Sequence, residues 1–165
     1  MTDFPRMLKH VTCWLLLGTG LFLALQAWQA QQRRSQFSAN GGVIELRRGS
    51  DGHFHWPGQV NGLTLAFLVD TGATRSALPQ ALALAAGLVQ EGRVQSSTAG
   101  GTVQGWTARA DLQLEGGLRF DRLPITVLPA LGSPLLGMDV LGKLQFNQQG
   151  GVLKLQAPAH CARPC

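Results

Sequence analysis

Short apolar runs separated by glycine-rich turns make up most of the chain after residue 42. Residues 63–69 form the most continuous of these runs, and residues 106–114 alternate between apolar and polar positions, as a strand with one buried face does. Shorter runs of strand-like composition occupy residues 42–47, 53–56, 118–120, 125–128, 144–146 and 152–155. Many short strands with frequent turns are typical of a closed or partly open barrel, so the pattern predicts an all-β fold.

One helix and one tight turn stand out within the strand pattern. Residues 78–88 are rich in alanine and leucine, which favour helix, and Gly87 stands where a helix often ends. Asn61 and Gly62 form a dipeptide typical of a two-residue hairpin leading into the run at 63–69. The sequence therefore predicts a single β domain with one short helix.

Asp70 follows the apolar run 63–69 directly, and small residues come after it. A carboxylate placed where a strand breaks into a turn lies at the edge of a core, where it can be oriented and shielded. Asp-Thr-Gly is also ordinary turn chemistry, so the position alone leaves a structural loop open. Asp70 is nevertheless the leading candidate for a catalytic group.

Two further segments with distinctive motifs follow the Asp70 turn along the chain. Residues 96–105 predict a glycine-rich hairpin, and residues 134–142 contain Leu135, Leu136 and Gly137. With the Asp-Thr-Gly-Ala segment, these motifs resemble the retropepsin family of single-lobe aspartic peptidases over residues 43–156. The resemblance is closest to bacterial membrane-anchored members and implies a retropepsin-like closed barrel.

The resemblance also implies roles for individual residues. Asp70 would be the catalytic residue, while Thr71 would hydrogen-bond to a second subunit and Gly72 would let the loop approach the substrate. Thr74 stands where retroviral enzymes have an aspartate, so substrate preference does not carry over. The substrate-binding residues implied in the loop and in the hairpin, which is the flap of this family, are Ala73, Thr74, Thr98, Ala99, Gly100 and Gly101.

Length limits the mechanism, because the chain has one Asp-Thr-Gly loop whereas pepsin-type chains have two. A mechanism that needs two carboxylates therefore requires a symmetric homodimer in which Asp70 of each subunit meets its partner. Such a pair activates a water molecule and needs neither a metal nor another cofactor. The expected function is endopeptidase cleavage of peptides or proteins; the alternative is a non-catalytic peptide-binding or dimerisation module.

Asp139 is the other carboxylate close to a motif. It follows the segment Leu135–Gly137, where we expect it to cap a following short helix. Replacement of Asp139 should then lower the stability of the fold and affect the activity less.

Residues 11–28 carry no charge and have Trp14 and Trp28 near their ends, as a membrane-spanning helix does. A cleaved signal peptide is the competing interpretation. Lysine and arginine occur on both sides, so charge does not settle the orientation. The expectation is a single-pass protein of the bacterial inner membrane with a periplasmic catalytic domain. The expected segments are a cytoplasmic end (1–10), the anchor (11–28), a polar linker (29–42), the protease domain (43–156) and a cysteine-containing tail (157–165).

The net charge of +5, from 14 Lys and Arg against 9 Asp and Glu, favours an anionic membrane surface. The basic residues are scattered and form no basic helix, so nucleic acid is not an expected partner. Cys161 and Cys165 could form a small disulfide loop in the tail, whereas a metal site there would need more ligands than His160 supplies.

Overall fold

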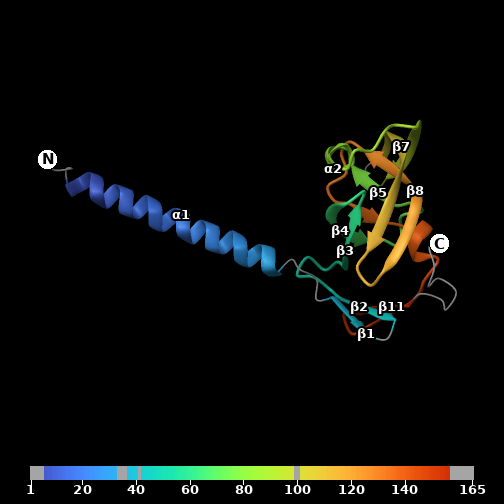
Figure 1. Ribbon diagram of the computed structural model, residues 1–165, viewed down its shortest axis with the longest axis horizontal. Helices are drawn as coiled ribbons and strands as arrows, with labels where there is room; N and C mark the ends of the chain where they lie inside the picture. Colours follow the sequence, from blue (N-terminus) through green and yellow to red (C-terminus); the bar gives the residue numbers. More distant parts are fainter. Residues whose placement is uncertain (1–5, 33–36, 41, 99–100, 157–165) are drawn as a thin grey trace. The chain divides into compact units, whose positions relative to one another are not determined.

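The computed structural model describes residues 6–32, 37–40, 42–98 and 101–156. The chain divides into two compact units, Met1–Arg34 and Ser35–Cys165. Figure 1 shows one long helix in the first unit and a mainly β second unit. The expected tail 157–165, with its two cysteines, lies outside the described residues.

The first unit contains helix α1 (Arg6–Gln32), which includes the whole segment 11–28. Its described side chains are exposed, among them Trp14 and Leu16, and Cys13 is exposed as well. Among the helices of the described residues, none combines the length and the apolar character that crossing a membrane requires. The segment 29–42, expected as a linker, is helical up to Gln32 and forms strand β1 at Phe37–Asn40.

The second unit is built around a closed barrel. Its strands follow one another around the barrel in the order β3 (His55–Val60), β4 (Leu63–Val69), β9 (Leu135–Leu136), β5 (Ala77–Pro79), β8 (Leu118–Leu128) and β7 (Gly101–Leu114). Pairing of β3 with β7 closes the ring, and β6 (Gly92–Thr98) extends the sheet beyond β7. At the closure Gly58 faces Leu114, and a Cβ at Gly58 would lie 2.6 Å from the Gln113 carbonyl oxygen. Only glycine lets the strands come this close.

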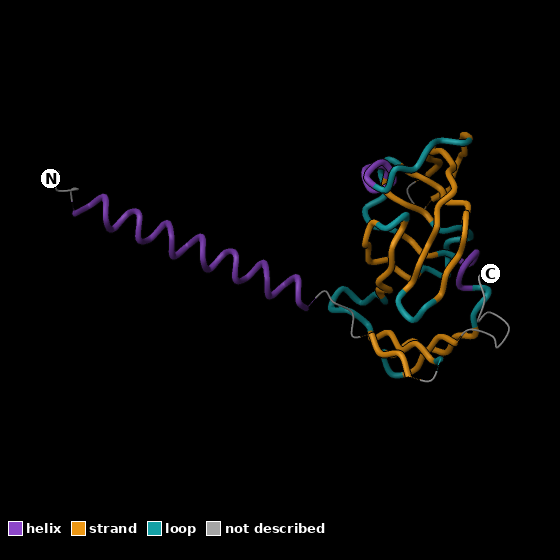
Figure 2. The backbone as a smooth tube through the Cα atoms, viewed as in Figure 1, coloured by secondary structure: helices purple, strands orange, loops and turns teal. Residues whose placement is uncertain are grey.

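A second sheet joins the two ends of the domain. Its order is β1, β2 (Val43–Arg47), β11 (Val152–Gln156) and β10 (Gln145–Gln149), and all its pairs are antiparallel. The turn between β10 and β11 contains Gly150 and Gly151, both with positive φ. Figure 2 shows this sheet beside the barrel. Strands from the beginning and the end of the second unit therefore pair in one sheet.

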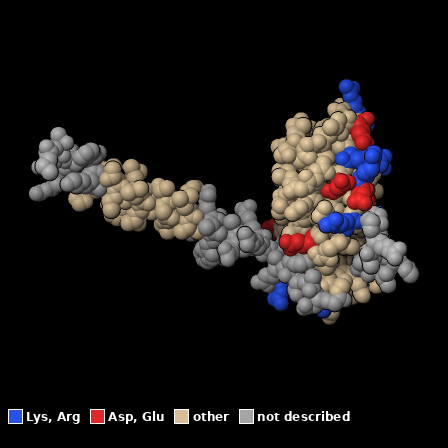
Figure 3. Space-filling model, viewed as in Figure 1, with Lys and Arg blue, Asp and Glu red and all other residues tan. Residues whose placement is uncertain are grey.

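Both sheets share one hydrophobic core. Trp56 and Phe67 from the barrel are fully buried, and Leu46 and Leu155 from the second sheet belong to the same cluster. The Trp56 indole N–H donates to the Glu115 carbonyl at 2.9 Å, which satisfies the one polar group of this large side chain. Charged residues of both signs lie side by side on the domain surface displayed in Figure 3.

The strand prediction is confirmed in outline, with three differences. The predicted helix 78–88 is shorter, α2 (Gln80–Ala85), because Ala77–Pro79 pairs as β5. A second short helix, α3 (Met138–Leu141), follows β9 at the place where a helix after Gly137 is expected, so the domain has two short helices where the fold-class prediction has one. Residues 118–120 and 125–128 belong to one strand, β8, whose pairing with β7 shifts register between Ala110 and Leu112.

Candidate active site

Asp70 lies at the end of β4, in the turn that the apolar strand opens into. It is half-buried, and its backbone N–H donates to the Leu136 carbonyl at 3.0 Å. That bond continues the parallel pairing of β4 with β9, in which Val69 faces Leu136. The Asp70 turn and the segment 134–142 are therefore neighbours in the structure.

The Asp70 carboxylate is oriented by its own loop. The Gly72 N–H donates to Asp70 Oδ1 at 2.8 Å, and the Ala73 N–H donates to the Asp70 carbonyl at 3.3 Å. A Cβ at Gly72 would lie 3.2 Å from Asp70 Oδ1, which is tighter than an ordinary contact. Thr71 and Gly72 are exposed. One carboxylate oxygen is thus bound to the backbone at a surface turn that a second molecule can reach.

Gly137 is the point of closest approach between the second motif and the loop. A Cβ there would lie 2.5 Å from the Arg75 carbonyl carbon and 2.9 Å from the Ala73 carbonyl oxygen. Next to it, the Met138 N–H donates to the Ala73 carbonyl at 2.8 Å. A residue with a Cβ would not fit here, so glycine at this position permits the close approach of the two backbones.

The expected capping role of Asp139 is wrong. Gly137 is the N-cap of α3 and no side chain caps the helix, while Asp139 lies within its first turn. The Asp139 carboxylate instead accepts from Ser76, whose N–H and hydroxyl donate to Oδ1 at 3.0 Å and 2.8 Å. The physical reason is that the chain after the loop returns past α3, so the nearest donors to this carboxylate belong to Ser76 rather than to the helix.

Ser76 is the site residue that the sequence interpretation missed. It is fully buried, and its hydroxyl also accepts a hydrogen bond from the Gly137 N–H at 3.1 Å. A serine between the exposed Arg75 and an apolar strand carries no distinctive signal in the sequence. Its role depends on a partner that lies 63 residues away along the chain.

The structure places the predicted substrate-binding residues in two groups. Ala73 is half-buried and Thr74 is exposed, and both lie in the Asp70 loop. In the predicted flap, β6 and β7 form the hairpin, with Thr98 facing Gly101 at its end. Ala99 and Gly100, together with the side chain of Thr98, lie outside the described residues. The hairpin strands are therefore confirmed, whereas the contacts of its tip with substrate stay a prediction.

A pocket of about 200 Å³ adjoins the active-site loop. It opens between Thr71, the end of β4 and the second sheet, and most of its lining is apolar. The lining residues are Phe54, Val69, Thr71, Leu141, Phe146, Gln148, Leu153 and Leu155. Such a pocket suits an apolar side chain. Within the part of the chain that the structure describes, no three His, Cys, Asp or Glu residues gather as metal ligands would.

A closed barrel with an Asp-Thr-Gly turn after one strand, and a glycine-containing motif beside it, defines a retropepsin-like fold. Sequence comparison agrees, since residues 56–143 match the family described as "gag-polyprotein putative aspartyl protease". This match covers more than half of the chain, and the chain belongs to this family of aspartic proteases. Comparison with curated protein sequences gives no match.

One solved structure supports the fold assignment. The chain is similar to a retropepsin-like aspartic protease from Rickettsia conorii, with 26% sequence identity and a TM-score of 0.57. That similarity covers 74% of this chain and 96% of the Rickettsia chain. The protease of EIAV, solved with the inhibitor HBY-793, is a more distant likeness, with 22% identity, a TM-score of 0.45 and coverage of 53% of this chain and 84% of the other.

Proposed function

We propose that this protein is an aspartic endopeptidase in which Asp70 of two copies of the chain activates water. The observation that carries the proposal is the position of Asp70. Its carboxylate is half-buried, is bound to the Gly72 N–H, and lies in a loop that contacts the second motif of its family. A carboxylate held in this way at a surface turn is poised for acid–base chemistry.

Two carboxylates are needed because one group cannot both accept and donate a proton in the same step. At a separation of about 4 Å, two negative charges repel by about 4 kcal/mol at an effective dielectric constant of 20. The pair therefore shares one proton and titrates as a unit. The ionised member takes a proton from water while the protonated member polarises the scissile carbonyl, so water adds to the peptide without a covalent intermediate.

A second copy of this chain would complete the site. Retropepsin-like proteases act on peptide substrates and commonly as dimers. In the single chain Thr71 and Gly72 are exposed beside Asp70, which leaves the surface of this loop accessible. The Thr71 hydroxyl can donate and accept at once, so it would join the two loops across the axis. No cofactor takes part in the proposed mechanism.

Peptide substrates would lie over the same loop. The small side chain of Ala73 would contact the substrate side chain next to the cleaved bond. The neutral hydroxyl of Thr74 would hydrogen-bond to the substrate backbone. The flap residues Thr98, Ala99, Gly100 and Gly101 would cover the substrate from the other side. Because Thr74 is uncharged, the loop itself imposes no demand for a basic substrate residue at this position.

We further propose that residues 11–28 attach the domain to a bacterial inner membrane, with the domain in the periplasm. Support comes from the absence of charge in this segment and from the large apolar side chains exposed on α1, such as Trp14 and Leu16. The location stays a prediction until the protein is fractionated.

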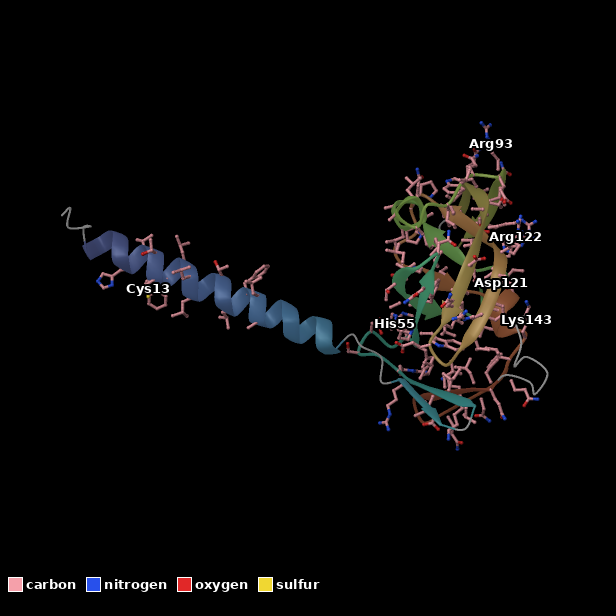
Figure 4. The ribbon with its side chains drawn as sticks, in the orientation of Figure 1. Cys13, His55, Arg93, Asp121, Arg122 and Lys143 are labelled. Carbon is pink, nitrogen blue, oxygen red and sulfur yellow. The ribbon has the colours of Figure 1, made fainter. Side chains whose placement is uncertain are left out.

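The decisive experiment is digestion of a peptide library by the purified full chain beside its Asp70→Asn variant. The matched control is Asp121→Asn, which removes an exposed carboxylate on β8 (Figure 4). The wild type and the control should cleave the same peptides, while Asp70→Asn should be inactive with an unchanged circular dichroism spectrum. Equal cleavage by the Asp70→Asn protein would remove Asp70 from the mechanism.

A further inference from the structure

The start, the middle and the end of the active-site loop are each hydrogen-bonded to one short segment, Leu136–Asp139. At the start of the loop the Asp70 N–H donates to Leu136, and in its middle the Ala73 carbonyl accepts from Met138. At its end Ser76 donates to Asp139. The position of Asp70 therefore depends on how firmly the loop is held at both ends.

Ser76 is hydrogen-bonded to several segments at once. Its N–H and its hydroxyl both donate to Asp139 Oδ1, and its hydroxyl oxygen accepts from the Gly137 N–H. Its carbonyl accepts from the Thr126 N–H on β8 at 3.0 Å. The side chain is fully buried, so water does not compete for these bonds. Ser76 thus connects the loop to α3 and to the barrel.

The two oxygens of the Asp139 carboxylate are in unequal surroundings. Oδ1 accepts two hydrogen bonds, whereas Oδ2 is buried and has no hydrogen-bond partner among the described residues. A buried carboxylate oxygen without a donor carries a desolvation cost. The Ser76 N–H and hydroxyl both converge on the oxygen that is bound, so Ser76 is attached to Asp139 at two points.

We propose that Asp139 is a positioning residue for Asp70, acting through Ser76. Its carboxylate holds the end of the loop 70–76 against α3 and thereby keeps the Asp70 carboxylate in the orientation that pairing with a second Asp70 needs. This inference rests on the proposed function of Asp70. It assigns Asp139 an effect on the chemical step, not only on folding.

The kinetic test compares Asp139→Asn and Ser76→Ala with the control Asp121→Asn in the full chain. Both site variants should lower kcat per folded protein about 10-fold or more, with KM changed by less than about 3-fold. The pH profile of kcat should also shift, because the coupling between the two Asp70 carboxylates depends on their separation. A purely structural role would reduce the folded fraction and leave kcat per folded protein and its pH profile unchanged, which would overturn the proposal.

The double variant tests whether Asp139 acts through Ser76. If it does, Asp139→Asn combined with Ser76→Ala should lower kcat no further than the stronger single variant, since the contact is already lost. If the fold-losses in kcat of the two single variants multiply in the double variant, the two residues act independently. That result would overturn the claim that Asp139 acts through Ser76.

Amide hydrogen exchange tests the positioning role of Asp139 without depending on peptidase activity. Amide hydrogen exchange of Asp70 and Gly72 should accelerate in Asp139→Asn and in Ser76→Ala, while exchange of the buried Ile125 on β8 stays slow. If the wild type is inactive, the proposed function is wrong, and the hydrogen-exchange measurement alone then tests the positioning role of Asp139. Unchanged exchange at Asp70 and Gly72 in the folded variants would overturn the positioning role. Should Asp139→Asn not fold, Ser76→Ala decides alone.

Discussion

The backbone N–H of Asp70 donates to the carbonyl of Leu136, so the proposed catalytic residue and the second motif are joined by a direct hydrogen bond of 3.0 Å. Parallel pairing of β4 with β9 produces this bond, and β9 is only two residues long. A short strand has few bonds with which to keep its register. The contacts that follow it, from Gly137 to Asp139, therefore matter for holding the loop in place.

Replacing Gly137 with alanine should damage both fold and activity. The new Cβ would meet backbone atoms of Arg75 and Ala73 at less than 3.0 Å, so the backbone itself would have to shift. We expect a loss of about 3 kcal/mol in the free energy of unfolding, as overpacking of a tight site does, together with a large loss of peptidase activity. Chemical denaturation and a cleavage assay measure the two effects.

The matched control for this change is Gly132→Ala. Nothing lies within 4 Å of a Cβ added at Gly132, so this variant should keep the stability and activity of the wild type. Equal behaviour of the two variants would contradict the close approach at Gly137.

The local features of this fold were predictable, because they depend on neighbours in sequence. Asn61 and Gly62 both have positive φ, as the predicted hairpin turn requires, and Gly87 has positive φ after the end of α2. The candidate loop at Asp70 was equally visible, since its motif is contiguous.

The remaining features depend on partners far away in sequence. Pairing of Leu78 with Val127 and of Pro79 with Leu128 turns the start of the predicted helix into β5, although the composition of this segment favours helix. Tertiary pairing overrides such a weak local preference. The Ser76–Asp139 contact is also long-range, and the capping prediction for Asp139 failed because it considered only the following helix.

The exposed Asp51 gives a pH-dependent prediction. The His53 N–H, followed by the His55 side chain, holds the pKa of the Asp51 carboxyl below its ordinary value of 3.8. Because the pKa is lower in the folded state, this carboxylate stabilises the fold above 3.8, and the contribution is lost as the pH falls through the folded-state value. Asp51→Asn should therefore reduce the free energy of unfolding at neutral pH and match the wild type in acid. A difference that persists unchanged into acid would contradict this cause.

Membrane attachment predicts where the full chain is found after cell lysis. The full chain should sediment with membranes, because the uncharged segment 11–28 would be removed from water there. Protease added outside spheroplasts should digest the domain if it is periplasmic. Recovery of the full chain in the soluble fraction would contradict attachment, and protection from the protease would place the domain on the inner side.

A shared pair of Asp70 residues predicts that activity depends on concentration. Specific activity should fall on dilution as the dimer separates, because each chain contributes one Asp70. Activity measured over a dilution series, with sedimentation velocity on the same samples, relates the loss to the dimer. Constant activity per chain in samples that sediment as monomers would exclude the shared pair.

Inactive chains should also poison active ones. Mixing the wild type with an excess of Asp70→Asn chains forms heterodimers that hold one Asp70 carboxylate, and such dimers lack the second group that the mechanism needs. With random association, a roughly ninefold excess leaves about one tenth of the wild-type subunits paired with each other, so activity should fall to about one tenth. An equal excess of Asp121→Asn chains should raise total activity instead, because those chains keep Asp70. If excess Asp70→Asn chains leave the activity unchanged after subunit exchange is complete, each chain works alone and the homodimer mechanism is wrong.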